Sequence, residues 1–368
     1  NVAHLWEPVT PTTSPTTTTA TTTASSSSPT PTSACTMTGT DVIVTTQNGE
    51  TLSYNRKTPR TKTPFGLVFE GKFGAPAMKV VVKEINNVKV DALVFQKFFD
   101  AKMTTQKEID CEYIVKMLLT TTVNIQSASK RLVVLEYCNG GNLAQHLTHT
   151  GPMVDDDVID IFHDLSSALT YLSGIGSMHG DIKESSILLH RSTPSNRTVY
   201  KLSDVGQSRY AATALYGSPR MFAPEVVHRQ TSVLCGIEAD LWSFGAVLYK
   251  CVTCKDLRDG GAVTDVIGAM RTWQWEDDML NRVESTRVSS ALKTAMGPIL
   301  GQLLQHNPAQ RRSHDSPHSQ PTFAAFMQRL LKSMQEAAAT SYNQQQQQQQ
   351  QQQLALKREP VIEPDDSA

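Results

Sequence analysis

We expect an α+β fold for this chain, whose sequence contains both strand-like and helix-like patterns. Residues 78–85 form a run rich in β-branched side chains, which is typical of a buried strand. Residues 41–45 alternate between polar and apolar and precede an Asn48-Gly49 turn, which indicates a short hairpin. Residues 158–172, in contrast, are apolar at i, i+3, i+4 and i+7, which is the period of an amphipathic helix.

The overall composition is that of a globular chain with no strong charge bias. The formal net charge is -1 and no basic block stands out, so neither nucleic acid nor an acidic membrane surface is an expected partner. The six cysteines show no framework spacing, which favours a reducing, cytoplasmic compartment. No run of about 18 apolar residues occurs, so no membrane span is expected in this chain. Because the chain begins with Asn1 rather than Met, the question whether a leader or membrane segment precedes it stays open.

Both ends of the chain differ in composition from the middle. Residues 10–34 are almost entirely Thr, Ser, Pro and Ala, so we predict a disordered segment over 1–40 and prefer a cytoplasmic tether to a mucin-like stalk. Ten glutamines occupy 344–353, and we predict a disordered tail over 334–368. A protein-interaction tract, including a glutamine-rich scaffold, and neutral repeat drift both explain the glutamines.

Residues 179–189 read His-Gly-Asp-Ile-Lys-Glu-Ser-Ser-Ile-Leu-Leu, which places an acid, a base and a hydroxyl directly before an apolar run. This pattern resembles the catalytic loop of the eukaryotic protein kinases, His-Arg-Asp-x-Lys-x-x-Asn. Two positions depart from it, since Gly180 replaces the arginine and Ser186 replaces the asparagine. Further matches follow in the family's order, so the resemblance implies a kinase domain over 55–333. Its small lobe, mainly β with one helix, would cover 55–137, and its large, mainly α lobe would cover 138–333.

The resemblance also implies a reaction, the transfer of the ATP γ-phosphate to Ser or Thr hydroxyls of a protein substrate. Asp181 would orient the substrate hydroxyl and accept its proton, and Lys183 would neutralise charge on the transferring phosphoryl group. A lysine two residues after the aspartate is the serine/threonine-kinase pattern. Asp204, which opens an Asp-Val-Gly match to the family's Asp-Phe-Gly, would bind Mg²⁺. Ser186 would be a second and weaker metal ligand, because a hydroxyl replaces an amide carbonyl.

The nucleotide site is implied by further segments in the first half of the chain. The family's glycine-rich hairpin matches residues 61–71, but Thr61 and Thr63 stand at its first two glycine positions. A lysine within a β-branched run is costly to bury unless it meets an anion, which supports a phosphate contact for Lys83. The residues implied to bind ATP are Gly66, Val68, Val81, Lys83, Glu136, Cys138 and Leu188.

Other matches concern the helix and the activation segment that flank the active site in the kinase family. Residues 91–109 have helical spacing and resemble the family's C helix, whose glutamate pairs with the strand lysine. Asp100 and Glu108 are the nearest acids, and the choice between them stays open. Residues 217–225 resemble the end of the activation segment, and Arg311 is expected to form a buried ion pair with Glu225.

A pseudokinase, acting as a nucleotide-binding or scaffold signalling module, is the competing hypothesis. The lost loop glycines, the unassigned helix glutamate, Val81 in place of a small alanine, and Ser186 favour it. Retention of the principal charged residues favours the enzyme, which is our leading prediction. These residues are Lys83, Asp181, Lys183 and Asp204.

Overall fold

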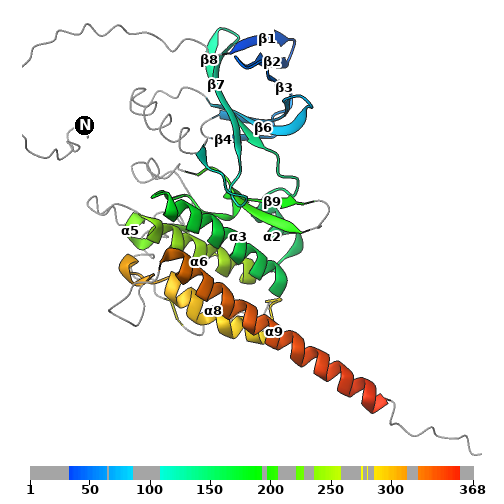
Figure 1. The fold of residues 1–368 in the computed structure, drawn as a ribbon, viewed down its shortest axis with the longest axis vertical. Helices are drawn as coiled ribbons and strands as arrows, with labels where there is room; N and C mark the ends of the chain where they lie inside the picture. Colours follow the sequence, from blue (N-terminus) through cyan, green and yellow to red (C-terminus); the bar gives the residue numbers. More distant parts are fainter. Residues whose placement is uncertain are drawn as a thin grey trace, which may run out of the picture.

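The computed structural model describes residues 33–63, 66–85, 108–192, 197–205, 221–227, 236–257, 275–276, 280, 286–312 and 322–356. Figure 1 shows two lobes, a β-sheet lobe built from the first part of the chain and a helical lobe built from the rest. The prediction of an α+β fold with a small β lobe and a large α lobe is confirmed.

The small lobe is one antiparallel sheet with strand order β1-β2-β3-β5-β6-β8-β7, in which β4 also pairs with β5. The strands are β1 (Ala34–Thr38), β2 (Asp41–Thr45), β3 (Thr51–Asn55), β4 (Thr61–Thr63), β5 (Gly66–Phe73), β6 (Met78–Ile85), β7 (Met117–Ile125) and β8 (Ala128–Glu136). Because successive side chains alternate between the two faces, one face carries a continuous apolar cluster. Phe69, Val82 and Leu132 are fully buried in it.

The two ends of this sheet approach each other. Ser33 Oγ, next to β1, lies 2.8 Å from Thr121 Oγ1 on β7. Val42 and Val44 on β2 are fully buried in the same cluster as Val123 on β7. The hairpin predicted from the alternation over 41–45 is therefore part of the small lobe, where it covers the apolar face.

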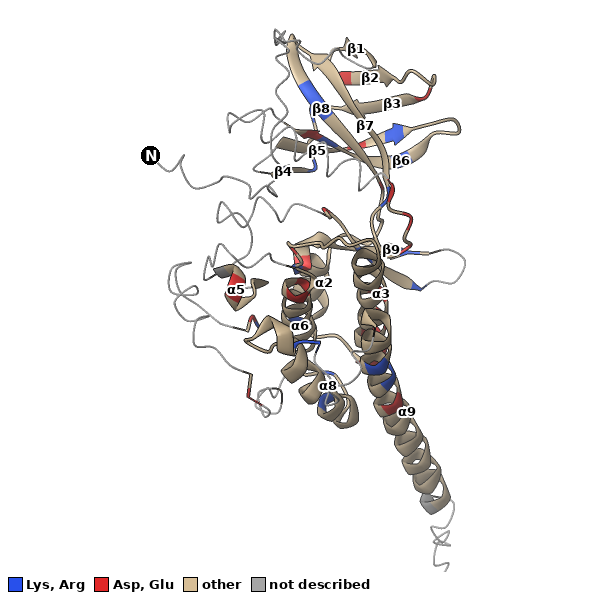
Figure 2. Ribbon diagram, turned by 60° about the vertical axis from the view of Figure 1, so that its left-hand side comes forward, with Lys and Arg blue, Asp and Glu red and all other residues tan. Residues whose placement is uncertain are grey.

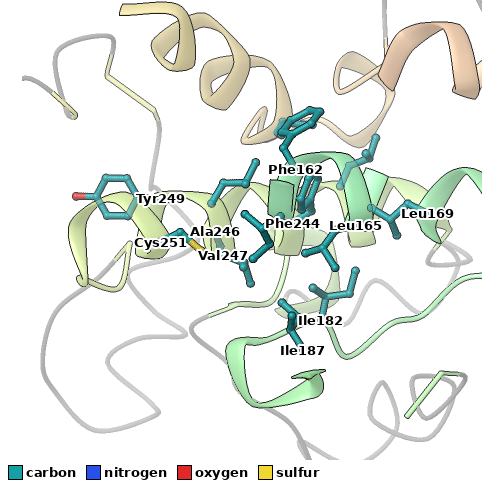
Figure 3. Packing of buried hydrophobic residues seen from close by; sticks show 14 of the residues in the cluster. Phe162, Leu165, Leu169, Ile182, Ile187, Phe244, Ala246, Val247, Tyr249 and Cys251 are labelled. Carbon is teal, nitrogen blue, oxygen red and sulfur yellow. The ribbon is translucent and has the colours of Figure 1, made fainter. Parts of the chain in front are cut away.

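The large lobe contains the helices and one two-stranded sheet. Its elements are α2 (Leu143–Thr150), α3 (Asp155–Gly174), η1 (Glu184–Ser186), β9 (Ile187–Arg191), β10 (Thr198–Leu202), α5 (Pro224–Val227), α6 (Ile237–Thr253), α8 (Ser290–Leu303), η3 (Pro308–Gln310) and α9 (Phe323–Leu356). Helix α6 is buried along almost its whole length, as expected of a helix that is apolar on all sides. The rings of Phe162 on α3 and Phe244 on α6 are 5.2 Å apart, and Figure 3 shows them side by side.

Both predicted disordered flanks need correction within the described residues. Residues 34–38 form β1 rather than a disordered segment, because Cys35 and Met37 pack against the small-lobe core. The predicted disordered tail is wrong over 334–356, which continue α9 through the glutamines. Alanine and glutamine are good helix formers, and the start of α9 is anchored by buried Phe326 and Leu330. Residues 1–32 and 357–368 lie outside the described residues, and the domain limits at 55 and 333 stay predictions.

The end of α9 leaves the large lobe and projects away from it (Figure 1). Among the described helices, none is both long and apolar enough to cross a membrane.

Candidate active site

The catalytic-loop residues lie between α3 and β9 and are held by one another. Lys183 Nζ lies 2.6 Å from Asp181 Oδ2. His179 is fully buried, and its Nδ1 accepts the Asp181 backbone N–H at 3.1 Å. Since that nitrogen is the acceptor, Nε2 carries the hydrogen and donates to the Ser203 carbonyl at 2.7 Å. His179 thereby connects Asp181 to the residue before Asp204, a role that the sequence motif alone did not reveal.

Asp240 on helix α6 also holds this loop in place. Its carboxylate accepts the backbone N–H groups of His179 and Gly180, each at 2.6 Å. Burial raises the pKa of Asp240 to about 7, although the two N–H bonds oppose that shift. Gly180 has φ of 76°, a left-handed conformation that glycine adopts without strain. The absence of the family's arginine at this position thus coincides with a backbone shape that suits glycine.

Ser186 is buried inside the loop. Its Oγ accepts the Lys183 N–H at 3.1 Å and lies 3.0 Å from the Asp181 carbonyl and 2.9 Å from the Lys183 carbonyl. A hydroxyl has one hydrogen, so it donates to one of these carbonyls at a time. The described contacts therefore give Ser186 a part in shaping the loop, and metal binding by this residue stays a prediction.

Lys83 and Asp204 meet although they come from different lobes. Lys83 Nζ on β6 pairs with Asp204 Oδ1, just beyond β10, and the side chains are 23% and 30% exposed. Of the two acids considered as helix partners for Lys83, Glu108 is exposed and Asp100 lies outside the described residues. The structure thus brings together the predicted phosphate-binding cation and the predicted magnesium-binding carboxylate.

An apolar cluster adjoins this pair. It contains Leu135 and Cys138 at the end of β8 and beyond, with Val81 on β6 and Leu188 on β9 packed against it. Val68 is buried on β5, directly across from Lys83. Burial, together with the charge of Glu136, raises the pKa of Cys138 to about 12, so its thiol stays protonated at neutral pH. Val81, Cys138 and Leu188, three of the residues predicted to bind ATP, therefore lie together.

The hairpin that corresponds to the glycine-rich loop is formed by β4 and β5. Thr61 pairs with Val68, Thr63 pairs with Gly66, and Thr63 Oγ1 donates to the Gly66 carbonyl at 3.1 Å. Gly66 has φ of 155°, and a Cβ added there would lie 1.8 Å from the Glu84 carbonyl oxygen. Only glycine allows the first residue of β5 to approach β6 this closely.

Gly66→Ala is expected to lower the free energy of unfolding by roughly 2 kcal/mol or more, because it combines backbone strain with a clash against main chain. Gly74→Ala is the matched control, since φ there is 84° but a Cβ meets only the Pro76 carbonyl oxygen at 3.7 Å. Chemical denaturation of both variants measures the difference. Equal losses would contradict the requirement for close approach at Gly66.

The predicted ion pair between Arg311 and Glu225 is confirmed. Arg311 Nη1 and Nη2 contact the two carboxylate oxygens of Glu225 at 2.6 and 2.8 Å, and the arginine side chain is fully buried. The guanidinium also lies over the ring of Trp242 on α6, 5.1 Å from its centroid. Ser218, Gly206 and most of the activation-segment match lie outside the described residues.

The comparison with known families agrees with this geometry. The family model described as "Protein kinase domain" matches residues 63–323, well over half of the chain. The chain therefore belongs to the protein kinase domain family.

Curated relatives carry serine/threonine-protein kinase names. The chain is 34% identical over 203 residues to serine/threonine-protein kinase ULK1 of Homo sapiens, covering 52% of this chain and 18% of that protein. It is 26% identical over 257 residues to serine/threonine-protein kinase ATG1b of Arabidopsis thaliana, covering 67% and 33%. It is 34% identical over 205 residues to serine/threonine-protein kinase unc-51 of Caenorhabditis elegans, covering 52% and 23%. The matches thus span a third or less of these relatives' own length.

Proposed function

We propose that this chain is a protein serine/threonine kinase that transfers the γ-phosphate of ATP to protein hydroxyls. The observation that carries the proposal is the contact between Lys83 of the small lobe and Asp204 of the large lobe. In this proposal Lys83 would bind the phosphates and Asp204 would bind magnesium, and Asp181 and Lys183 of the adjacent loop would act on the substrate.

The donor groups fit ATP and Mg²⁺. Mg²⁺ prefers oxygen ligands and usually combines one or two carboxylates with substrate phosphates, and Asp204 offers a partly exposed carboxylate. Bound magnesium would neutralise charge on the phosphates. The ammonium of Lys83 suits the α and β phosphates. Ser186 would complete the metal site only if its hydroxyl turned away from the loop carbonyls.

The adenine would lie against the apolar cluster, between Val81 and Leu188. Gly66 and Val68 would cover it from the hairpin. The Glu136 backbone N–H donates to the Lys116 carbonyl at 3.0 Å, so the contribution of Glu136 would come from its carbonyl oxygen. The backbone of Cys138 would supply the complementary contact.

The catalytic step would depend on positioning and charge. Asp181 would orient the substrate hydroxyl and accept its proton, while Lys183, 2.6 Å away, would stabilise charge on the transferred group. The lysine at this place supports Ser and Thr as acceptors.

The proposal extends to partners and location. The protein kinase family acts on proteins with ATP, and a protein substrate is proposed accordingly. A cytoplasmic location is supported by the free cysteines of the described residues, Cys35, Cys111, Cys138, Cys251 and Cys254. The projecting end of α9 is available for interactions through the glutamine tract.

Transfer of labelled γ-phosphate from ATP to a generic basic protein tests the proposal. Lys83→Met should lower the rate at least about tenfold, because a charge-assisted phosphate contact is lost. Lys72→Met on the neighbouring strand is the control, since Lys72 is exposed, and it should retain the wild-type rate. Chelation of divalent metal should abolish transfer. A wild-type protein that transfers no more phosphate than Lys83→Met would support the pseudokinase instead.

A further inference from the structure

The side chain of Glu136, at the point where β8 enters the connection between the lobes, makes contacts in two directions. Its Oε1 accepts the Lys116 backbone N–H at 2.8 Å, and its backbone N–H donates to the Lys116 carbonyl at 3.0 Å. Both carboxylate oxygens also accept from Lys201 Nζ, at 2.9 and 3.0 Å. Lys201 is only 9% exposed and lies on β10, three residues before Asp204.

The segment 113–116, just before β7, connects Glu136 to β10 through backbone hydrogen bonds, so that these contacts form a closed ring. The Val115 N–H donates to the Leu202 carbonyl at 2.8 Å, and the Leu202 N–H donates to the Tyr113 carbonyl at 2.9 Å. The chain before β7 is therefore bonded to β10 on one side and to Glu136 on the other. The Lys201–Glu136 ion pair is the third contact of the ring. It joins the connection between the lobes directly to β10, the strand that leads to Asp204. Figure 2 shows charged residues of both signs along the connection between the lobes.

The next residue in the connection is attached differently. Lys79 Nζ lies 3.9 Å from the centroid of the Tyr137 ring, and Arg60 donates to the Tyr137 hydroxyl at 3.3 Å. Arg60 and Lys79 belong to the small lobe. Tyr137 therefore fixes the connection to the small-lobe strands, whereas Glu136 is the residue that fixes it to the strand before the metal-binding position.

We infer that Glu136 and Lys201 act as positioning residues that set the distance between the adenine-binding backbone and Asp204. ATP contacts both places at once, with its base at the connection and its metal-bound phosphates at Asp204. If this distance is already fixed in the free protein, less conformational entropy is lost when ATP binds at both places. A ligand that occupies only the adenine end gains nothing from it. The inference rests on the proposed function, because it assumes that ATP occupies this cleft.

The inference is tested by calorimetry, which measures the affinity of each variant for two ligands. The first ligand is the non-hydrolysable β,γ-imido analogue of ATP with Mg²⁺, and the second is adenosine. Lys201→Met should weaken the Mg-nucleotide about tenfold and adenosine by about twofold or less, because only the first ligand spans the two places. A purely structural role would change both affinities by the same factor, and that outcome would overturn the inference.

Two further variants separate positioning from other effects. Lys201→Met leaves the Glu136 carboxylate without its cation, so the double variant Glu136→Gln/Lys201→Met removes both charges. It should keep the selective loss, and recovery of wild-type affinity would show that charge alone was responsible. Arg56→Met is the matched control. Arg56 pairs with buried Glu84 at 2.8 Å, and that carboxylate keeps its bond from Tyr54. The contacts of the ring described above involve neither Arg56 nor Glu84. Arg56→Met should leave the ratio of the two affinities unchanged. A wild-type protein that bound neither ligand would overturn the proposed function, and the inference with it.

Discussion

Asp181→Asn is expected to lower the phosphoryl-transfer rate by a factor on the order of 10² to 10⁴, the usual contribution of a positioned general base. The amide cannot accept the proton of the substrate hydroxyl, and it replaces the carboxylate that Lys183 Nζ contacts at 2.6 Å. The backbone of the loop should be little changed. The Asp181 N–H bond to His179 and the bonds from His179 and Gly180 to Asp240 do not involve the Asp181 side chain.

This substitution should therefore separate catalysis from binding. The affinity for the Mg-nucleotide analogue, measured by calorimetry, is expected to change by about threefold or less, while kcat falls steeply. The thermal midpoint of unfolding serves as the control for folding. An Asp181→Asn protein with an undiminished kcat would show that Asp181 takes no part in the reaction.

Arg311→Met is expected to produce the largest loss of stability. Removal of the Arg311 guanidinium leaves the Glu225 carboxylate without its bidentate partner, and the Glu225 side chain is only 9% exposed. Breaking a buried pair by removing one partner typically costs about 3–5 kcal/mol, because a charge stays buried without compensation. The variant also loses bonds from the guanidinium to the Gln305 and Glu238 carbonyls, at 2.8 and 2.9 Å.

The next residue supplies the matched control. Arg312 pairs with Glu238 at 2.7 Å, but its side chain is 39% exposed. Exposed pairs contribute about 0–1 kcal/mol, so Arg312→Met should have a small effect. Urea denaturation followed by circular dichroism gives the free energy of unfolding for both variants. Similar losses for the two substitutions would contradict a special structural role for the Arg311–Glu225 pair.

Much of the fold and site could be predicted because the relevant residues are close in sequence or form a known order of motifs. The catalytic loop lies within eleven positions, 179–189, and the order of the motifs is enough to predict the pair of Arg311 with Glu225. The cluster of Val81, Cys138 and Leu188 was likewise predicted from motif order.

Contacts that neither closeness in sequence nor the order of the motifs indicates could not be predicted. Lys201 and Glu136 are separated by 65 positions, and neither residue type indicates which partner it will meet. The role of His179 depends on a carbonyl that comes from Ser203. Strand β1 begins at Ala34, immediately after a Thr/Ser/Pro-rich run, where composition gave the opposite prediction. Low-complexity composition predicts disorder for the glutamine tract, whereas the intrinsic preference of glutamine favours the helix that the tract forms.

Identification of the labelled amino acid after incubation with γ-labelled Mg-ATP and a protein substrate tests the central claim most directly. The wild-type chain should produce phosphoserine or phosphothreonine, and Asp181→Asn should reduce this label by a factor on the order of 10² or more. Manganese in place of magnesium provides a second condition under which activity should be detectable. Label confined to phosphotyrosine would contradict the serine/threonine assignment. No label above that of Asp181→Asn with either metal would contradict the kinase activity itself.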